Sequence, residues 1–341
     1  MGTAISSLLD GEETAVEELA HRVLVVDAYN MLYQFLTTIR TRDGTPLKNS
    51  KGRTTSHMVG LFSRISNFMG HQHKLVFVYD GKTPDLKAAE IARRKSVKQQ
   101  AAKHLAKAEQ EEDIAGMKKY AGRTAVLTKD MVKESQQLLD ALGIPWLVAP
   151  SEAEAQAARM VQDGKADFVV SQDMDCLLFG APKMLRNLSI SGKRKRPGTS
   201  SYYTINPEII TLEKELERLE ISQTQLIALG MLVGTDFNPK GIKGLGPKKS
   251  LKLVKEHGDD LEKIFSEAKW DEHQEVSWET VYGVINDMPT TEKYEIKWKK
   301  IDREAVMNLL VDEFEFSAER VTSALDKLTI AKQQKGLSEF F

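Results

Sequence analysis

The chain has 341 residues, of which 41% are hydrophobic, so it can bury a large core and form one large domain or two ordinary ones. Its 48 Lys and Arg residues balance 49 Asp and Glu residues, and a formal net charge of −1 favours no particular partner. A single cysteine excludes an internal disulfide, and no apolar run approaches the roughly 20 residues that span a bilayer, so we expect an intracellular protein without a membrane segment.

Short β-rich runs alternate with helix-like stretches in the first half of the chain. The runs that predict buried strands are residues 23–26, 74–79, 124–127, 145–148 and 168–171. This alternation predicts an α/β fold with a mainly parallel central sheet flanked by helices. In such folds the ligand crevice lies beyond the carboxyl ends of the strands, where functional residues are therefore expected.

Two other parts of the chain have a different pattern. Residues 82–121 form a long, charged and apolar-poor stretch, which we interpret as a helical insertion. Beyond residue 216 the chain is mainly helical, with a Gly-rich break at 241–247 and further helices near 303–314 and 317–328. The last residues, 331–341, have no periodicity and resemble a tail.

Carboxylates follow the predicted strands. Asp27 and Asp80 each end a strand, and Asp173 and Asp175 follow another. Further acids begin the helix after the strand at 145–148 or follow the apolar stretch at 231–235; they are Glu152, Glu154 and Asp236. A capping box formed by Ser151 and Glu154, or an ordinary turn after a strand, would explain any one of these acids alone.

These ordinary roles do not explain why several acids meet at one sheet edge. Two carboxylates about 4 Å apart repel by about 4 kcal/mol at a moderate effective dielectric, so a cation has to lie between them. Oxygen ligands without His or Cys suit Mg²⁺ or Mn²⁺, and two such ions can activate water and stabilise a leaving oxygen. Without these seven acids, the rest of the chain carries a net charge of +6 (−1 + 7), which suits a polyanionic substrate.

Five blocks of sequence resemble the active-site blocks of the flap endonuclease family, in the family's order. They are Val26-Asp27, Tyr79-Asp80-Gly81-Lys82, Ser151-Glu152-Ala153-Glu154-Ala155, Asp173-Met174-Asp175-Cys176 and Gly234-Thr235-Asp236. The resemblance implies a 5′ nuclease (PIN-like) fold with two Mg²⁺ ions per active site, for which Mn²⁺ can substitute. It assigns Asp27, Asp80 and Glu152 to one metal, and Glu154, Asp173, Asp175 and Asp236 to the second.

The insertion at 82–121 carries a concentrated positive charge. Eight basic and two acidic residues between 82 and 107 give a local charge of +6, and a helix over 84–107 would be about 36 Å long. A solvated charged helix is the simpler interpretation of such a stretch. In the family, however, this region is a helical arch, and Lys87 and Arg94 match the basic pair that contacts the scissile phosphate. Their expected role is to stabilise charge in the transition state.

The Gly-rich break at 241–247 opens a basic helix. Exposed N–H groups at a helix N-terminus bind phosphate without reading bases, although an ordinary turn and helix would look the same. The segment 223–258 resembles the family's helix-two-turn-helix element, which grips duplex DNA and commonly holds K⁺. The DNA-binding residues implied by the resemblance are Gly2, Tyr33, Arg40, Arg64, Gly244, Gly246, Lys248 and Lys249, with Tyr33 matching the aromatic on which a base stacks. The basic loop 193–196 is open to three interpretations: phosphate contacts, a nuclear targeting signal or a solvated hairpin tip.

The final residues resemble the motif by which replication proteins dock on the sliding clamp. The anchors of that motif would be Gln334, Leu337, Phe340 and Phe341. We therefore expect a nuclease core over 1–325 and a flexible clamp-binding tail over 326–341. The chain ends at the motif, as in archaeal members, which favours a cytoplasmic, nucleoid-associated protein over a nuclear one.

The resemblance implies a monomeric, structure-specific 5′ flap endonuclease with 5′–3′ exonuclease activity, acting in Okazaki fragment maturation and base excision repair. Two other functions compete with it. A noncatalytic clamp-associated DNA-binding protein would have no use for all the metal-binding carboxylates. A metal-dependent phosphatase for small esters would leave the basic arch and the Gly-rich turn without a purpose.

Overall fold

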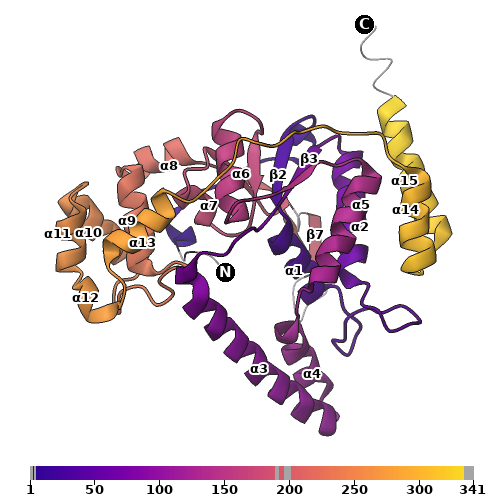
Figure 1. The fold of residues 1–341 in the computed structure, drawn as a ribbon, viewed down its shortest axis with the longest axis horizontal. Coiled ribbons are helices and arrows are strands. Elements are labelled where there is room, and N and C mark those ends of the chain that lie inside the picture. The colour runs from indigo at the N-terminus through magenta and orange to yellow at the C-terminus, as the bar shows by residue number, and fades with distance from the viewer. Residues whose placement is uncertain (1–2, 4, 189–191, 196–200, 334–341) are drawn as a thin grey trace, which may run out of the picture.

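A computed structural model describes residues 3, 5–188, 192–195 and 201–333. Its centre is a seven-stranded sheet with the order β1-β9-β6-β5-β2-β3-β4 (Figure 1). The strands are β1 (Glu12–Glu13), β2 (Val23–Asp27), β3 (Lys74–Tyr79), β4 (Trp146–Val148), β5 (Phe168–Val170), β6 (Lys183–Arg186) and β9 (Glu208–Thr211). Strands β4, β3, β2, β5 and β6 are parallel to one another, and β9 and β1 are antiparallel additions. The predicted α/β fold with a mainly parallel sheet is confirmed.

The sheet separates two hydrophobic cores, because successive strand residues point to opposite faces. Val25 and Val169 belong to one core, which is closed by α6 (Ala153–Gln162), α7 (Asp175–Leu178) and α9 (Gln223–Val233). Leu24 and Val26 belong to the other core. That second core is closed by α1 (Ala28–Thr38), α2 (Ser56–Gly70), α5 (Lys129–Leu142), α14 (Arg303–Met307), the π-helix η6 (Asn308–Glu313) and α15 (Ala318–Gln333). Short 3₁₀ turns η1 (Ser6–Leu8) and η2 (Val16–Leu19) precede β2.

The insertion is a helical hairpin that projects from the body (Figure 1). It consists of η3 (Asp85–Lys87), α3 (Ala88–Gln110), α4 (Ile114–Ala121) and η4 (Gly122–Thr124). Ala101 and Ala108 are buried where the two helices meet, and the rings of His104 and Tyr120 stack at 5.0 Å between centroids. We call residues 82–121 the arch. The strand predicted at 124–127 is wrong: Val126 is exposed, and the segment only connects the arch to the N-cap Thr128 of α5.

A helical lobe follows the sheet (Figure 1). It contains α8 (Leu212–Leu219), α9, α10 (Pro247–His257), α11 (Leu261–Glu267), α12 (Trp270–His273) and α13 (Trp278–Asn286). Two turns separate α9 from α10: an isolated bridge pairs Thr235 with Asn238, and Leu245 N–H donates to the Ile242 carbonyl. The predicted helix, two turns and helix over 223–258 are therefore present.

Three further segments complete the fold. Strands β7 (Gly192–Lys195) and β8 (Tyr202–Ile205) form an antiparallel pair, so residues 193–195 of the basic loop lie in a strand, and Arg196 lies outside the described residues. An extended segment links α13 to α14. The C-terminal helix α15 continues to Gln333, with Leu328 buried, so residues 326–333 are helical and not part of a flexible tail as predicted. No helix in the described part of the chain combines the length and apolar character of a bilayer span.

Candidate active site

Two of the predicted carboxylates end neighbouring parallel strands. Asp27 is the last residue of β2 and also the N-cap of α1, because its Oδ1 accepts the Asn30 backbone N–H at 3.0 Å. Asp80 follows β3, and its Oδ1 accepts the Ala153 backbone N–H at 2.8 Å, at the start of α6. Both acids are thus fixed by helix N-termini, where backbone donors and the helix dipole favour negative charge.

A close backbone crossing brings Asp80 beside the start of α6. Gly81 N–H donates to the Ser151 carbonyl at 2.7 Å, and a Cβ at Gly81 would lie 1.8 Å from the Ala149 oxygen. Only glycine permits that approach, so Gly81 holds Asp80 against the segment that carries Glu152. Glu152 is the N-cap residue of α6.

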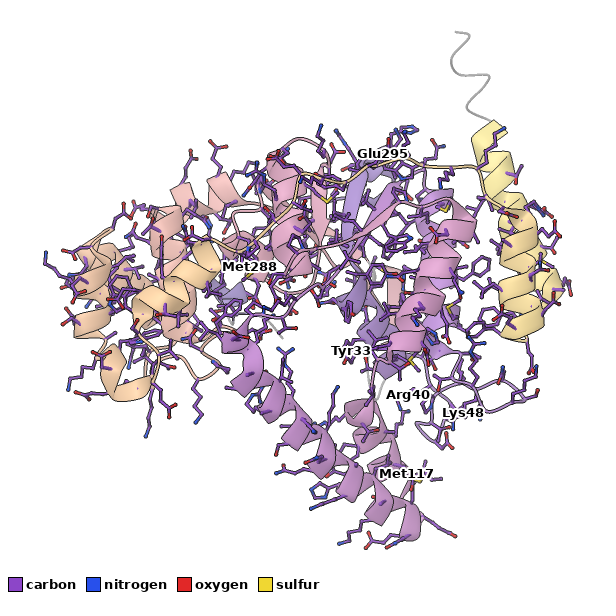
Figure 2. All side chains as sticks on the ribbon, viewed as in Figure 1. Tyr33, Arg40, Lys48, Met117, Met288 and Glu295 are labelled. Carbon is purple, nitrogen blue, oxygen red and sulfur yellow. The ribbon has the colours of Figure 1, made fainter. Side chains whose placement is uncertain are left out.

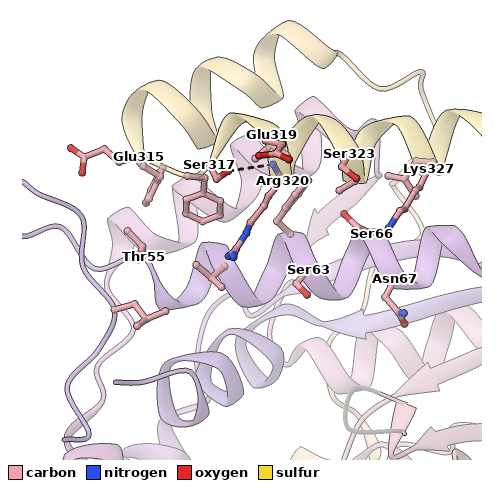
Figure 3. Close-up of a pocket in the computed structure, with 18 of the residues that line it drawn as sticks. Thr55, Ser63, Ser66, Asn67, Glu315, Ser317, Glu319, Arg320, Ser323 and Lys327 are labelled. Carbon is pink, nitrogen blue, oxygen red and sulfur yellow. Dashed lines mark hydrogen bonds between the residues drawn. The ribbon is translucent and has the colours of Figure 1, made fainter. Parts of the chain in front are cut away.

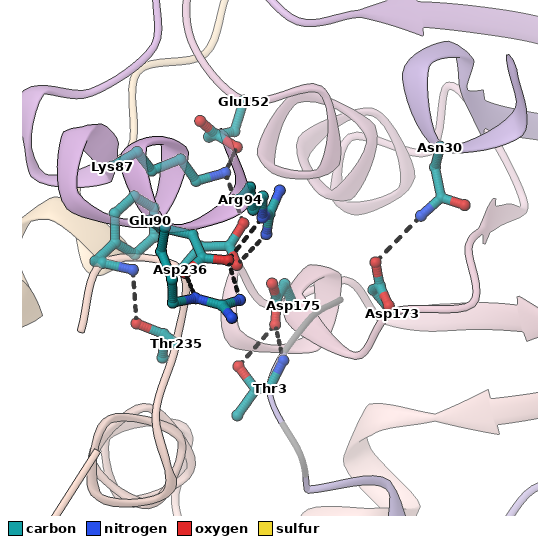
Figure 4. A network of polar contacts seen from close by, with 12 residues as sticks. Thr3, Asn30, Lys87, Glu90, Arg94, Glu152, Asp173, Asp175, Thr235 and Asp236 are labelled. Carbon is teal, nitrogen blue, oxygen red and sulfur yellow. Dashed lines mark hydrogen bonds and ion pairs between the residues drawn. The ribbon is translucent and has the colours of Figure 1, made fainter. Parts of the chain in front are cut away.

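Three more predicted acids lie around the ends of β5 and α6. Glu154 accepts the Ser171 hydroxyl hydrogen at 2.9 Å. Asp173 accepts from the side-chain amide of Asn30 at 3.2 Å. Asp175 begins α7, and its Oδ1 accepts both the backbone N–H and the hydroxyl of Thr3, each at 2.7 Å (Figure 4).

The seventh acid, Asp236, comes from the first turn after α9. Asn238, buried in this turn, accepts from the Thr235 hydroxyl at 2.7 Å and donates to the Met231 carbonyl at 2.6 Å. These bonds fix the turn against the end of α9. The Asp236 carboxylate then reaches toward the base of the arch.

The arch sends two cationic side chains to these acids (Figure 4). Lys87 Nζ forms an ion pair with Glu152 and lies 3.3 Å from Asp236 Oδ2. Arg94 Nη2 lies 2.7 Å from Asp236 Oδ1. The predicted basic pair is therefore in direct contact with two of the predicted metal ligands.

Burial and mutual repulsion raise the pKa of several carboxyl groups. Burial, then the charges of Asp80 and Asp173, raise the pKa of Asp27 from 3.8 to about 8. Burial, followed by the charge of Asp175, raises the pKa of Glu154 well above its usual range, and burial also raises the pKa of Asp175. Such shifts show that the ionised acids lack sufficient positive charge around them.

The acids beside the arch experience similar forces. Burial raises the pKa values of Asp80 and Glu152, although Lys87 opposes the shift in both. Burial disfavours the charge on Lys87, but Glu152 and Asp236 outweigh that effect and raise its pKa. The charge of Asp236 contributes to the raised pKa values of Asp80, Glu152 and Asp175, so it influences members of both predicted groups of metal ligands.

The donor chemistry fits hard divalent cations, since every predicted ligand offers carboxylate oxygen. The side chains are not arranged as a metal site in this structure: across the described ranges, no three Asp, Glu, His or Cys side chains are placed to hold an ion. The physical reason is that Glu152 and Asp236 turn to Lys87 and Arg94, while Asp27, Glu154 and Asp175 turn to neutral donors. Metal ligation by these seven residues remains a prediction.

The predicted DNA-binding residues that the structure describes come from different elements of the fold. Tyr33 is half-buried on α1, and Lys98 Nζ from α3 lies 4.9 Å from its ring centroid. Arg40 donates to the carbonyls of Leu36 and Gly44, both at 2.8 Å, which gives it a structural role (Figure 2). Arg64 lies on α2 with its guanidinium 5.9 Å from the Phe68 ring centroid.

The second turn of the α9–α10 connection is open to solvent. Its exposed residues include Gly244, Gly246, Lys248 and Lys249. Gly246 is the N-cap of α10. Because glycine has no side chain, the N-cap residue does not accept a side-chain hydrogen bond from the first N–H groups of the helix. Gly2, Gln334, Leu337, Phe340 and Phe341 lie outside the described residues.

Some residues of the site were not identified from the sequence. Thr3, Asn30 and Ser171 contact the acids, and Glu90 binds the arginines of the arch. Asn30 had a detectable signal, because it lies three residues after Asp27 at a helix start. Thr3 had none, since it meets Asp175 across 172 residues of sequence.

One large groove lies away from these acids. It has a volume of about 1120 Å³ and runs between α2 and α15 (Figure 3). Its walls include Ser63 and Ser66 from α2 and Arg320 and Ser323 from α15. None of the seven acids lines it.

A parallel sheet with acids at the carboxyl ends of its strands and a basic arch beside them defines a nuclease of the XPG type. The family models agree: the XPG N-terminal domain matches residues 5–101, and the XPG I-region matches residues 143–236. These two matches contain all seven acids.

Comparison with individual proteins gives the family. The chain is 45% identical to flap endonuclease 1 of Hyperthermus butylicus over 337 residues, covering 98% of this chain and 96% of that protein. It is 42% identical to flap endonuclease 1 of Methanosarcina acetivorans, with complete coverage of both. The solved structure of flap endonuclease-1 from Methanococcus jannaschii is 34% identical, with a TM-score of 0.77 over 98% of this chain and 100% of that one. The chain belongs to the flap endonuclease family.

A DNA complex is also among the structural relatives. The catalytic core of Rad2 in complex with DNA substrate is 25% identical, with a TM-score of 0.68 over 93% of this chain and 96% of that chain. The resemblance drawn from the five sequence blocks is therefore confirmed at the level of family and fold.

Proposed function

We propose that this chain is a metal-dependent, structure-specific 5′ flap endonuclease that also has 5′–3′ exonuclease activity. The observation that carries the proposal is the contact between the arch and the acids: Lys87 and Arg94 reach the carboxylates of Glu152 and Asp236. A strand that passes beside α3 would bring its phosphate to this meeting point. The relatives named above are flap endonucleases, which supports the same substrate for this chain.

The acids would hold two Mg²⁺ ions, for which Mn²⁺ can substitute. Asp27, Asp80 and Glu152 form the first expected group; Glu154, Asp173, Asp175 and Asp236 form the second. Ions bound there would supply an activated water and would stabilise charge on the phosphate oxygens. The raised pKa values of Asp27, Glu154 and Asp175 support this proposal, because a divalent ion would relieve the repulsion that causes them.

The side chains of the arch would then bind the scissile phosphate. Lys87 and Arg94 now contact carboxylates, and a phosphate offers the same anionic oxygens in their place. Donors held in this position stabilise the additional charge of the transition state. Tyr33, beside Lys98 at the inner face of α3, would stack on a base next to the cut.

The second turn between α9 and α10 would bind duplex backbone. Gly244, Gly246, Lys248 and Lys249 are exposed there, and α10 directs uncapped N–H groups outward. A K⁺ ion bound at this turn would add to the attraction for phosphate. Arg64 and Gly2 would contribute further DNA contacts. Arg40 would contribute indirectly, through its structural role.

The C-terminal tail would dock on a sliding clamp through Gln334, Leu337, Phe340 and Phe341. It follows α15, which ends at Gln333, so the motif would be presented at the end of a helix. We further propose a monomer that acts in the cytoplasm, associated with the nucleoid, during Okazaki fragment maturation and base excision repair.

The direct experiment uses the full chain with labelled 5′ flap, nicked duplex and single-stranded DNA in Mg²⁺, with Asp175→Ala as the control. We expect cleavage near the flap junction that is lost in EDTA and in Asp175→Ala. Flap binding without cleavage would instead support a noncatalytic clamp-associated protein. Hydrolysis of small phosphate esters without flap cleavage would support a phosphatase.

A further inference from the structure

Glu90 is a buried acid on an otherwise exposed helix. Of the 23 residues of α3, all of them described, Glu90, Ala101 and Ala108 are buried. The two alanines lie where α3 meets α4, which explains their burial, but Glu90 is 3% exposed near the other end of the helix. A charged residue is seldom buried to this extent unless it is paired.

The partners of Glu90 are the two consecutive arginines of α3, of which Figure 4 labels Arg94. Arg93 donates from Nε to Oε2 at 2.6 Å and from Nη2 to Oε1 at 2.7 Å. Arg94 donates from Nε to Oε1 at 2.7 Å. These hydrogen bonds, with that of Arg93 the strongest influence, lower the pKa of Glu90, so the carboxylate is ionised at neutral pH.

The bond to Arg94 fixes the direction of its guanidinium. Nε is held by Glu90, and Nη2 of the same planar group lies 2.7 Å from Asp236 Oδ1. A guanidinium held at Nε has its Nη2 in a fixed direction, because the group is rigid and planar. Glu90 thereby helps to point Nη2 of Arg94 at the acidic site.

An ordinary salt bridge between neighbouring turns of a helix provides a contrast. Lys107 and Glu111, also four residues apart in the arch, are 3.6 Å apart and 70% and 59% exposed. Such a pair contributes little beyond helix stability. Glu90 differs in its burial, in its short bonds to two arginines, and in the contact that one of them makes with Asp236.

We propose that Glu90 is a positioning residue for the flap-cutting reaction: it orients Arg94 toward the scissile phosphate. This inference rests on the proposed function, in which Arg94 stabilises the transition state. Glu90 itself does not touch the substrate. Removing it should therefore lower the rate of the chemical step while leaving flap binding nearly unchanged.

The test is a double-mutant cycle measured by single-turnover cleavage of a saturating flap substrate in Mg²⁺. We expect Glu90→Ala to lower the rate on the order of tenfold and to change flap affinity by less than about twofold. Glu90→Gln, which retains an acceptor for Arg94 Nε, should restore part of the rate. In an Arg94→Ala background, Glu90→Ala should cause no further loss, because its effect acts through Arg94.

Glu111→Ala is the matched control, since it removes the acid at the C-cap of α3, whose ion pair is with an exposed lysine. It should leave the rate unchanged. An equal loss in Glu111→Ala, additive losses in the cycle, or a wild-type rate for Glu90→Ala would overturn the inference. Cleavage by the wild type together with any of these results leaves the proposed function intact and removes only the role of Glu90.

A spectroscopic measurement tests the same inference without cleavage. The Nε–H of Arg94 should give an NMR signal that exchanges slowly with solvent, assigned through its loss in Arg94→Lys. We expect this protection in the wild type and Glu111→Ala, and its loss in Glu90→Ala. Fast exchange in the wild type would show that Glu90 does not hold Arg94.

Discussion

The two sides of the acidic site balance their charge differently. Glu152 and Asp236 have Lys87 and Arg94 of the arch as counter-charges. Among the described residues, the hydrogen bonds to Glu154 and Asp175 come from neutral donors, and burial and repulsion raise their pKa values. Lys87 and Arg94 therefore supply positive charge to the side next to the arch, whereas the other side needs protons or bound cations.

This difference connects metal binding with substrate binding. On the side of Glu154, the hydrogen bonds to Glu154 and Asp175 within the described part of the chain come from neutral donors, so a divalent ion would not compete there with an ion pair. On the side of Glu152, Lys87 and Arg94 have to leave the carboxylates before an ion and a phosphate can both be bound. The arch would then exchange carboxylate oxygens for phosphate oxygens at little electrostatic cost, because the two partners are alike in charge.

The largest expected effect on cleavage comes from removing the charge of an acid on the side of Glu154 and Asp175. Asp175→Asn keeps the acceptor oxygen for Thr3 and removes only the charge. We expect flap cleavage to fall by a factor on the order of 10³ or more, because metal binding provides most of the catalysis. The metal-free variant should be at least as thermally stable as the wild type, since a repelled carboxylate is gone. Cleavage within about tenfold of the wild type would place the metals elsewhere.

Removing a cation of the arch should give the next largest effect on cleavage, but it should not weaken metal binding. Lys87→Met should lower the cleavage rate by about 10² to 10³ while Mn²⁺ binds no more weakly, because a competitor of the ion has been removed. Lys107→Met, an exposed lysine of the same arch, is the control for charge. Weaker Mn²⁺ binding in Lys87→Met, measured by calorimetry, would mean that Lys87 supports the metal site.

Thr3 should have an intermediate effect through Asp175. Thr3→Val removes the hydroxyl bond at 2.7 Å and preserves side-chain shape. We expect about tenfold weaker Mn²⁺ binding, as for other residues that orient metal ligands, and recovery in Thr3→Ser. Equal affinities for Thr3→Val and the wild type would confine Thr3 to a structural role.

The smallest effect concerns the stability of the metal-free protein at different pH values. The pKa of Asp27 is raised from 3.8 to about 8 in the fold, so the folded state binds this proton more tightly than the unfolded state. Its stabilising contribution is complete below about pH 4 and is lost as the pH rises through about 8.

We therefore expect Tm in EDTA to decrease by a few degrees between about pH 5 and 8. Added Mg²⁺ should raise Tm more at the upper end of this range, where the acids are ionised. Asp27→Asn should make the decrease shallower. A Tm that rises with pH in both proteins would contradict the assigned direction of the Asp27 shift.

The sequence predicted the fold, and the places of the acids at strand and helix ends, because both depend on local patterns. Asp27 and Asp80 were recognised as strand ends, and parallel strands bring such ends to one edge. The strand expected at 124–127 was wrong because a short β-rich run also suits an exposed connection. The tail was placed too early because α15 has few apolar residues beyond those, such as Leu328, that contact the core.

The partners of the acids could not be predicted in the same way. Thr3 and Asp175, or Arg94 and Asp236, meet only after the chain has folded, across 172 and 142 residues. Burial of Glu90 on a polar helix likewise has no signature in periodicity. The positions of the acids follow from strand ends, whereas their counter-charges follow from tertiary structure.

The most direct measurement of the central claim is a crystal structure of the full chain soaked with Mn²⁺, using anomalous scattering to find the ions. We predict two Mn²⁺ peaks among the seven acids, with Lys87 and Arg94 withdrawn from Glu152 and Asp236. A structure without Mn²⁺ at these acids, in which both ion pairs persist at saturating metal, would contradict the account.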